Sequence, residues 1–199
     1  MRLSEYFNEY IFAPLGIEDI GFKPSAEQRS RISAMYNFNK GLGTSTEIPS
    51  VSLFDQLPNF ESGGGGLFSS VRDYVKVLSA IASNGETPDG YRILKPETVE
   101  MMKVNYLNDE TVKGFVKDHG YRYGYGWGLC GRVHVDPVLS LSPSPVGEFG
   151  WSGAANAYAL MDTDNRLAIF YATHVMGASY GYDMVHTKLR DLVYDAISK

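Results

Sequence analysis

The sequence predicts an α+β fold, in which an antiparallel sheet packs against helices. Amphipathic helical patterns fill the first part of the chain, short alternating strands fill the second, and one more helical pattern closes it. The predicted strands are joined by short links, which favour antiparallel pairing because parallel neighbours need a long crossover connection. The chain of 199 residues is therefore expected to form a single domain, with helices and loops over residues 1–120 and the sheet with its terminal helix over residues 121–199.

Composition limits the kinds of partner. The net charge is −5, and Lys and Arg are scattered singly with no basic stripe, which argues against nucleic acid and against an anionic membrane surface. No run approaches the roughly 18 apolar residues of a membrane span. Residues 1–12 are not expected to form a signal peptide, because Glu5, Asn8 and Glu9 stand where an apolar core would be needed. The chain is expected to be soluble, and its compartment is not predicted.

The first half begins with a helix and continues irregularly. Ser4 is expected to cap this helix, which ends at Ala13-Pro14-Leu15-Gly16, where proline and glycine stop it. A helix that starts so close to the initiator Met suggests a chain cut from something longer. Residues 17–60 show no period and are expected to form a long surface excursion, with a short hairpin around Asn39-Lys40-Gly41.

Residues 62–105 carry a glycine run and two helices. Ser62-Gly63-Gly64-Gly65-Gly66 lacks the Lys of a phosphate-binding loop and is interpreted as a place of close backbone packing. Ser70 and Asp73 form a capping-box-like pair at the start of a helix that Asn84-Gly85 ends. Pro96 begins the next helix, which is expected to end near residue 105.

The second half carries the strand patterns. Tyr123–Leu129 alternates large residues with glycine, as a strand with one aromatic face would. A proline-bearing loop over residues 135–146 precedes a short strand at 148–152 and a hairpin at about 155–162 and 167–174. The last helix spans about residues 183–198. Its predicted buried stripe is Val185, Leu189, Leu192, Val193 and Ile197, and its predicted water-facing residues are His186, Lys188, Arg190 and Asp191.

Metal and thiol chemistry are not indicated. Cys130 is the only cysteine, so neither an intrachain disulfide nor a cysteine-based zinc site can form, and a buried small apolar residue is the simpler interpretation. His119, His134, His174 and His186 lack the spacings of metal-binding motifs. No metal and no cofactor are therefore expected.

The segment Gly150-Trp151-Ser152-Gly153 permits two interpretations. In the first, Gly150-x-Ser152-x-Ala154 is a nucleophile elbow, and an acid and a base follow it in the required order. They would be drawn from Asp162, Asp164, His174 and His186. An elbow needs a strand before the serine and a helix after it, whereas a proline-bearing loop precedes this serine and a hairpin follows. The sequence also lacks the βαβ units of an α/β-hydrolase sheet, so the elbow is disfavoured.

The second interpretation rests on five segments that follow one another in the order of a known family. They are Ser4–Asp19 with Pro14-Leu15-Gly16, Gly63–Asp73, Ile93–Val99, Tyr125-Gly126-Trp127-Gly128 and Trp151-Ser152-Gly153-Ala154. Together they resemble the serine β-lactamase-related family, which holds class C β-lactamases, D-alanyl-D-alanine carboxypeptidases and related esterases. The resemblance covers essentially the whole chain. It implies a partial β-lactamase/transpeptidase-like fold that corresponds to the C-terminal half of the family's domain.

The residues that start acyl transfer in that family have no counterpart here. The family's nucleophile is the Ser of Ser-x-x-Lys, whose Lys lies one helical turn away and helps to take the hydroxyl proton. No Ser of this sequence has that Lys; Ser69-Ser70-Val71-Arg72 comes nearest, but Arg stays protonated. Tyr106-Leu107-Asn108 matches the family's Tyr-x-Asn motif by chance, because it follows the Gly-rich helix instead of preceding the first helix. No catalytic residue is therefore expected in this chain.

The resemblance leaves half of a site. Trp151, Ser152 and Gly153 would line the cleft, and the Ala154 N–H would be an oxyanion donor. Trp151 stands where other members carry Lys, which removes the cation that would hold a carboxylate and favours an esterase-type member over a β-lactamase. A structural alternative for Trp151 is a half-buried aromatic residue at a strand start. The full domain would act on a small-molecule ester, β-lactam or peptide, and the chain alone is expected to be inactive.

A non-catalytic binding or assembly module is the alternative function. By the resemblance, the strand at residues 167–174 pairs with an N-terminal strand of the family's domain. Without that strand, Leu167–Thr173 would be an apolar open edge. Open edges recruit further strands. The expected partner is a second copy of the chain or the missing N-terminal half.

Overall fold

A computed structural model describes residues 1–48, 60–118 and 123–198. The chain divides into two units: the first comprises Met1–Val77, Ala154–Asn156 and Ala172–Ala178, and the second comprises Leu78–Gly153, Ala157–Tyr171 and Ser179–Lys199. The single domain over residues 1–199 stays a prediction. Its expected internal boundary at residues 120–121 lies outside the described residues, as does His119.

The first unit opens with a helix that changes its hydrogen-bonding pattern. Helix α1 (Leu3–Phe7) continues into the π-helical turn η1 (Asn8–Phe12), and the chain then passes through β1 (Ile20–Gly21) to α2 (Ala26–Arg31). The prediction that Ser4 caps the first helix is wrong, because the N-cap is Arg2. The Ser4 hydroxyl is used in a long-range contact, in which it donates to the Glu61 carboxylate over 2.6 Å.

The predicted hairpin around Asn39-Lys40-Gly41 is confirmed. Strands β2 (Met35–Asn39) and β3 (Thr44–Ile48) pair in antiparallel fashion, and β10 (Val175–Met176) adds to β2 in parallel. The Asn39 side chain closes the turn by accepting the N–H groups of Gly41 and Leu42 over 3.0 and 3.1 Å. The remaining strand of this unit, β4 (Phe68–Ser69), pairs with β1.

Helix α4 (Val71–Ala82) begins and ends near the predicted residues. The Ser70 hydroxyl accepts the Asp73 N–H over 3.1 Å, as a cap should. The Asp73 carboxylate does not complete a capping box, because it accepts the N–H groups of Glu18 and Asp19 over 3.0 and 2.8 Å. Asn84 and Gly85 both take positive φ angles, of 58° and 80°, and so stop the helix.

The second unit contains one antiparallel sheet in the strand order β5-β6-β7-β8-β9. Its strands are β5 (Tyr125–Trp127), β6 (Arg132–His134), β7 (Phe149–Ser152), β8 (Tyr158–Asp162) and β9 (Leu167–Tyr171). Its helices, besides the end of α4, are α5 (Pro96–Met102), α6 (Asp109–Asp118), α7 (Pro137–Ser140), the π-helical turn η3 (Gly181–Val185) and α8 (His186–Ile197). The α+β class with its antiparallel hairpin is confirmed, while α6, the short β6 and α7 were not predicted.

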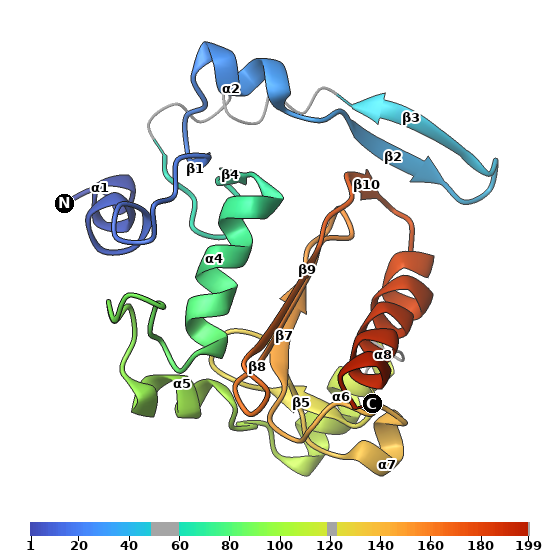
Figure 1. Ribbon diagram of the computed structural model, residues 1–199. Coiled ribbons are helices and arrows are strands. Elements are labelled where there is room, and N and C mark those ends of the chain that lie inside the picture. The colour runs from blue at the N-terminus through green and yellow to red at the C-terminus, as the bar shows by residue number, and fades with distance from the viewer. Residues whose placement is uncertain (49–59, 119–122, 199) are drawn as a thin grey trace. The chain divides into compact units, whose positions relative to one another are not determined.

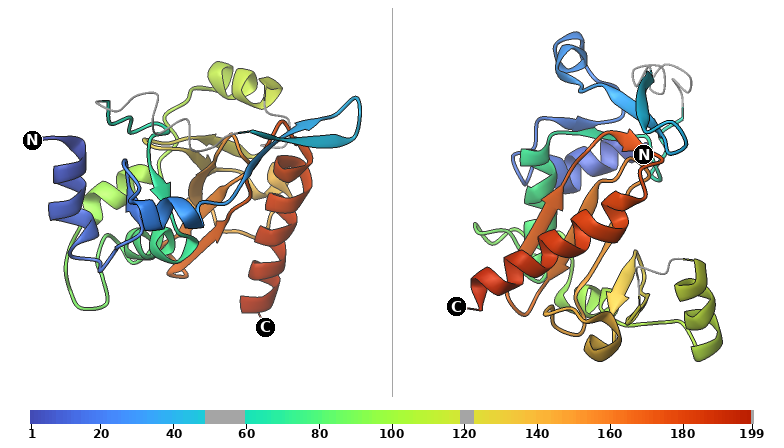
Figure 2. Two further views of the ribbon diagram at one scale, coloured as in Figure 1. Left: turned by 90° about the horizontal axis from the view of Figure 1, so that it is seen from above. Right: turned by 90° about the vertical axis from the view of Figure 1, so that its right-hand side faces the viewer.

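Helix α8 covers one face of this sheet (Figures 1 and 2). The core between them is built on Tyr158, Leu160, Ile169 and Tyr194, with Leu167, Tyr171, Leu189 and Val193 packed around it. These strand residues alternate with residues of the opposite face, as the period of a strand requires.

The predicted orientation of the last helix is partly wrong. His186 and Arg190 were expected to face water, but they are 3% and 6% exposed. Leu192 and Ile197 were expected to be buried, but they are exposed. The helix is turned so that these polar side chains meet polar and aromatic partners on the sheet, which are described below. Cys130 is likewise exposed, not buried as expected.

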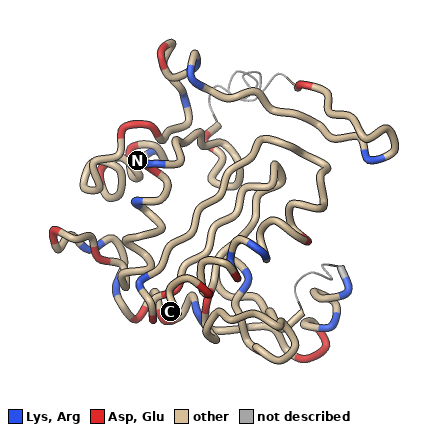
Figure 3. Tube along the Cα trace, turned by 45° about the vertical axis from the view of Figure 1, so that its right-hand side comes forward, with Lys and Arg blue, Asp and Glu red and all other residues tan. Residues whose placement is uncertain are grey.

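Charged residues are interspersed along the described part of the trace, where Lys and Arg form no continuous stripe (Figure 3). Among the described helices, none is both long and apolar enough to cross a membrane.

Candidate functional site

The segment Trp151–Ala154 lies where β7 ends and the chain turns toward β8. Trp151 pairs with Ala159, and Ser152 pairs with Tyr158, in the antiparallel register. Trp151 and Ser152 are half-buried, whereas Gly153 and Ala154 are exposed. Ala154 belongs to the first unit, so the geometry described here is that of Trp151, Ser152 and Gly153 in the second.

Two glycines allow the strands around this segment to approach closely. A Cβ atom on Gly150 would lie 2.0 Å from the Ala159 carbonyl oxygen, and one on Gly131 would lie 2.3 Å from the Gly150 carbonyl oxygen. Both contacts are with backbone, which cannot move aside without separating the strands. The tight backbone that the sequence indicated at Gly150 is therefore needed to hold β7 between β6 and β8.

Among the described residues, β6 covers the outer edge of β7 only as far as Gly150. Strand β6 pairs with Phe149 and Gly150, and in the described part of the chain its ladder does not extend to Trp151 and Ser152. The Gly153 N–H donates to the Ala157 carbonyl over 2.8 Å. Because backbone groups alternate in direction along a strand, the main-chain groups of Ser152 point the other way, toward the open edge.

Trp151 belongs to an aromatic row at the end of the sheet. Its ring meets that of Trp127 edge to face, with 4.4 Å between the ring centroids and 83° between the planes. Phe115 of α6 packs edge to face on Trp127, with 5.9 Å between the ring centroids and 70° between the planes. Edge-to-face packing of this kind fixes ring orientation, so Trp151 is held in a defined position beside the open edge.

Ser152 faces α8, where it meets a histidine. The Ser152 Oγ lies 3.5 Å from His186 Nδ1, at the upper limit of a hydrogen bond. The His186 ring stacks on Tyr158 with 4.7 Å between centroids and 23° between planes. A small pocket opens here. Its lining residues are Tyr125, Arg132, Ser152, Tyr158, Tyr182, His186, Thr187 and Arg190.

A buried polar network forms the floor of this pocket. The Arg132 guanidinium donates to the Glu148 carboxylate over 2.9 Å and to the Tyr158 hydroxyl over 3.0 Å. The Tyr125 hydroxyl donates to the second Glu148 oxygen over 2.9 Å and accepts from Arg190 over 2.7 Å. Burial, together with the charge of Glu148, raises the pKa of Tyr125 to about 12, so this hydroxyl keeps its proton and can donate.

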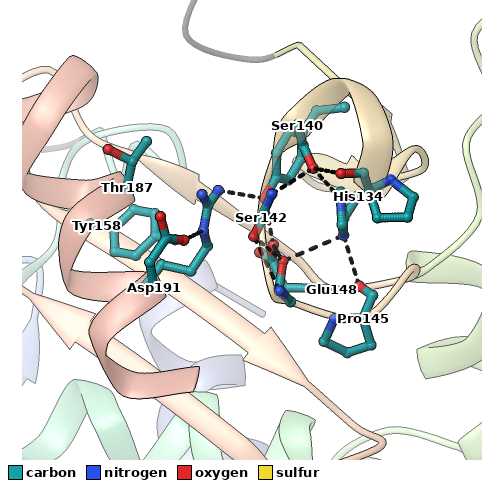
Figure 4. Close-up of polar contacts among 12 residues, drawn as sticks. His134, Ser140, Ser142, Pro145, Glu148, Tyr158, Thr187 and Asp191 are labelled. Carbon is teal, nitrogen blue, oxygen red and sulfur yellow. Dashed lines mark hydrogen bonds and ion pairs between the residues drawn. The ribbon is translucent and has the colours of Figure 1, made fainter. Parts of the chain in front are cut away.

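The network continues into the loop over residues 142–148 and the helix α7 (Figure 4). His134 is fully buried, with its ring nitrogens 2.7 Å from the Ser140 hydroxyl and 3.0 Å from the Pro145 carbonyl oxygen. Ser144 links this part to Glu148 through a contact of 3.3 Å. The sequence patterns did not predict this network. Its available signal was the alternation Arg132-Val133-His134, which is also the pattern of an exposed strand.

The nucleophile elbow is not assembled. A turn and β8, not a helix, follow Ser152. Of the proposed acids, Asp162 accepts the Tyr194 hydroxyl over 2.8 Å and closes the β8–β9 turn, and Asp164 pairs with Lys103. Of the proposed bases, His174 contacts Ser33 in the first unit, and only His186 lies beside Ser152.

The two residues that match the Tyr-x-Asn motif both make local contacts. Tyr106 is exposed, and its hydroxyl donates to the Met101 carbonyl over 3.3 Å. Asn108 caps the start of α6 by accepting the Thr111 N–H over 2.9 Å. Both residues thus have local structural roles. No group of three His, Cys, Asp or Glu side chains placed to hold a metal occurs among the residues that the structure describes.

Comparisons with known proteins give a consistent result. The family model Beta-lactamase matches residues 1–189. Protein Rv1367c of Mycobacterium tuberculosis is 30% identical over 175 residues, which are 85% of this chain and 42% of that protein. Acyltransferase calJ of Penicillium decumbens is 27% identical over 199 residues, which are 87% of this chain and 43% of that protein.

The fold has solved counterparts. The structure of unliganded simvastatin synthase (LovD) from Aspergillus terreus superimposes with a TM-score of 0.82 at 22% identity, and the match covers 100% of this chain and 52% of that one. The chain therefore spans about half the length of the relatives it matches, which agrees with the partial fold expected from the sequence.

Proposed function

Because the chain belongs to the β-lactamase family, we propose that β7, with Trp151-Ser152-Gly153 at the position of the family's third motif, is the third-motif strand of an acyl-serine hydrolase or acyltransferase site that acts on an ester or amide. The observation that carries this proposal is the end of β7 at Ser152, where the described β6 ladder has stopped at Gly150 and the Ser152 main-chain groups point away from β8. Open backbone groups beside a fixed aromatic ring suit the binding of an acyl group and of its oxyanion. On this proposal Ala154 supplies the oxyanion donor.

The chain provides binding groups but no attacking group. The sequence holds no Ser-x-x-Lys, and His186 and Ser152 do not stand on an elbow. An oxyanion donor lowers the barrier of a reaction only when a nucleophile attacks. We therefore expect the chain to bind an ester without turning it over. A neutral Trp151 in place of a cation favours an ester over a carboxylate-bearing β-lactam, and a named relative, calJ, is an acyltransferase.

Ester binding should change the fluorescence of one tryptophan. Trp127 and Trp151 are the only tryptophans of the chain, and they lie in contact. Titration with a short aliphatic ester should give a saturable change in emission in the wild type and in Trp127→Phe. The change should disappear in Trp151→Phe, because only Trp151 borders the open edge. An equal response in both variants would contradict the proposed site.

Turnover assays supply the control. A p-nitrophenyl ester and a chromogenic cephalosporin should both stay intact with the wild-type chain and with Ser152→Ala. Hydrolysis that the Ser152→Ala substitution abolishes would instead support the nucleophile elbow.

A specific observation also favours the second function, strand-mediated assembly. β9 is the last strand of the sheet in the described part of the chain. In an antiparallel sheet, the main-chain N–H and C=O groups of successive residues point to opposite sides of the strand. Followed from the Gly153–Ala157 hydrogen bond through the β7–β8 and β8–β9 registers, this rule points the main-chain groups of Leu167, Ile169 and Tyr171 toward β8. The N–H and C=O groups of Ala168 then point outward, where a further strand can pair with them.

Self-association should depend on that edge. We expect the sedimentation coefficient of the wild-type chain to rise with protein concentration. Ala168→Pro should suppress the rise, because proline removes an outward N–H donor while the ladder to β8 is kept. Ala168→Ser, which keeps the donor, should behave like the wild type. A wild-type chain that sediments as a monomer throughout the series would exclude this assembly.

A further inference from the structure

Two side chains at the start of the last helix hold consecutive residues of the candidate site. The Tyr182 hydroxyl donates to the Gly153 carbonyl over 2.8 Å. His186 Nδ1 lies 3.5 Å from the Ser152 Oγ. Tyr182 and His186 are four residues apart, so they lie on one face of the helical segment. We propose that they are positioning residues for the third-motif strand, an inference that rests on the proposed function.

Tyr182 acts on the oxyanion donor through the peptide plane. The Gly153 C=O and the Ala154 N–H belong to one peptide unit, which is planar and trans, so they point in opposite directions. A hydrogen bond that fixes the Gly153 carbonyl therefore fixes the direction of the Ala154 N–H as well. Without it, the exposed Gly153 would leave this peptide free to rotate, since glycine restricts its neighbours least. Tyr182 thus aims the donor without touching the substrate.

His186 is itself held rigidly. Its ring is 3% exposed and stacks on Tyr158. Two further rings pack edge to face on it. The centroid of the Tyr171 ring lies 5.9 Å away with 69° between the planes, and that of the Tyr182 ring lies 5.5 Å away with 89° between the planes. An imidazole enclosed by three aromatic rings has few orientations available, so Nδ1 stays directed at Ser152.

The backbone that carries Tyr182 and His186 has an uncommon hydrogen-bonding pattern. Gly181–Val185 form a π-helical turn, and the His186 N–H donates to the Gly181 carbonyl five residues earlier. Such turns are rare and are frequently found at functional sites. Here the turn joins the two positioning residues, and it ends where His186 begins α8. The wider turn and the contacts to Ser152 and Gly153 are therefore parts of one local arrangement.

Tyr182→Phe tests the first contact by removing one hydroxyl. The lost contact is at the Gly153 carbonyl, so its effect is read at the N–H of the same residue, whose bond to the Ala157 carbonyl should open more often. Amide exchange at this N–H, followed by NMR, should become about two- to tenfold faster, the range for the loss of one neutral hydrogen bond. Exchange in β8 should stay unchanged. Tyr180→Phe is the matched control, because Tyr180 is exposed, and it should change neither. Equal acceleration in β7 and β8 would mean a general loss of stability and would overturn the positioning role.

A pair of His186 variants tests the second contact. His186→Asn keeps a polar atom near the position of Nδ1, whereas His186→Gln places it near Nε2, and both lose the ring. Exchange at Gly153 and affinity for the aliphatic ester should be closer to wild type in the Asn variant. Equal behaviour of the two variants would show that only ring packing matters. If neither variant folds, Tyr182→Phe decides alone.

The two proposals fail in different ways. If the wild-type chain binds no ester, the proposed function is wrong, while the exchange data still measure the positioning of β7. If the ester binds equally well to wild type and Tyr182→Phe, and exchange at Gly153 is the same, the positioning role is wrong and the proposed function stands.

Discussion

Glu148→Ala should lower the free energy of unfolding by about 3–5 kcal/mol, the usual cost of breaking a buried ion pair from one side. Glu148 is 1% exposed, and its carboxylate accepts from Arg132 and Tyr125. Its removal leaves the Arg132 guanidinium buried with no carboxylate beside it, since Arg does not lose its proton in proteins. Urea unfolding followed by circular dichroism measures the loss.

A pair whose carboxylate is exposed provides the control for Glu148→Ala. Glu100 contacts Lys103 over 3.3 Å, and its side chain is 60% exposed. Glu100→Ala should therefore change stability by no more than about 1 kcal/mol, as surface pairs do. Replacing both buried partners, in Arg132→Met with Glu148→Leu, should recover much of the loss, because apolar side chains of similar size need no partner. A loss below about 1 kcal/mol for Glu148→Ala would show that Arg132 finds another partner.

Local rules explain the elements that the sequence predicted well. The β8–β9 hairpin could be predicted because the turn after Asp162 is built by neighbouring residues, with the Asp162 carboxylate accepting the Asp164 and Asn165 N–H groups. The end of α4 at Asn84-Gly85 and the cap at Ser70 are local in the same sense. Each of these signals lies within a few residues of the feature it sets.

The rotation of α8 could not be predicted, because its determinants are far apart in the sequence. A charged residue is expected to face water unless it has a buried partner. Arg190 reaches the Tyr125 hydroxyl, which lies 65 positions away, and His186 meets Tyr158 and Ser152. Neither partner is visible in the helical pattern, so apolar periodicity alone placed Leu192 and Ile197 inside.

The candidate site likewise combines residues that are adjacent in the sequence with residues that only the fold brings together. Trp151, Ser152 and Gly153 could be singled out because glycines and a motif lie next to one another in the sequence. The groups that surround them come from β5, β6 and the η3–α8 junction, and they meet β7 only in the fold. Tyr182 carries no motif, yet its hydroxyl is bonded to the Gly153 carbonyl. Sequence patterns thus identify the strand but not the residues that orient it.

Gly150→Ala should damage the candidate site more than any other single methyl addition along β7. The new Cβ would lie 2.0 Å from the Ala159 carbonyl oxygen, so β7 and β8 must separate at the register that places Ser152 opposite Tyr158. Overpacking of this kind costs about 1–3 kcal/mol and displaces backbone. We expect a lower urea midpoint and loss of the ester-dependent change in Trp151 fluorescence.

Gly114→Ala is the matched control for this substitution. Gly114 lies in α6, and a Cβ there would meet nothing within 4 Å. Alanine in a helix interior is favoured over glycine by about 1 kcal/mol, so this variant should be slightly more stable than the wild type and should bind the ester normally. The same added methyl group would then have opposite effects at two glycines, because only Gly150 faces a neighbouring strand. If Gly150→Ala is as stable as Gly114→Ala and still binds the ester, close contact between β7 and β8 is not what holds Ser152 in place.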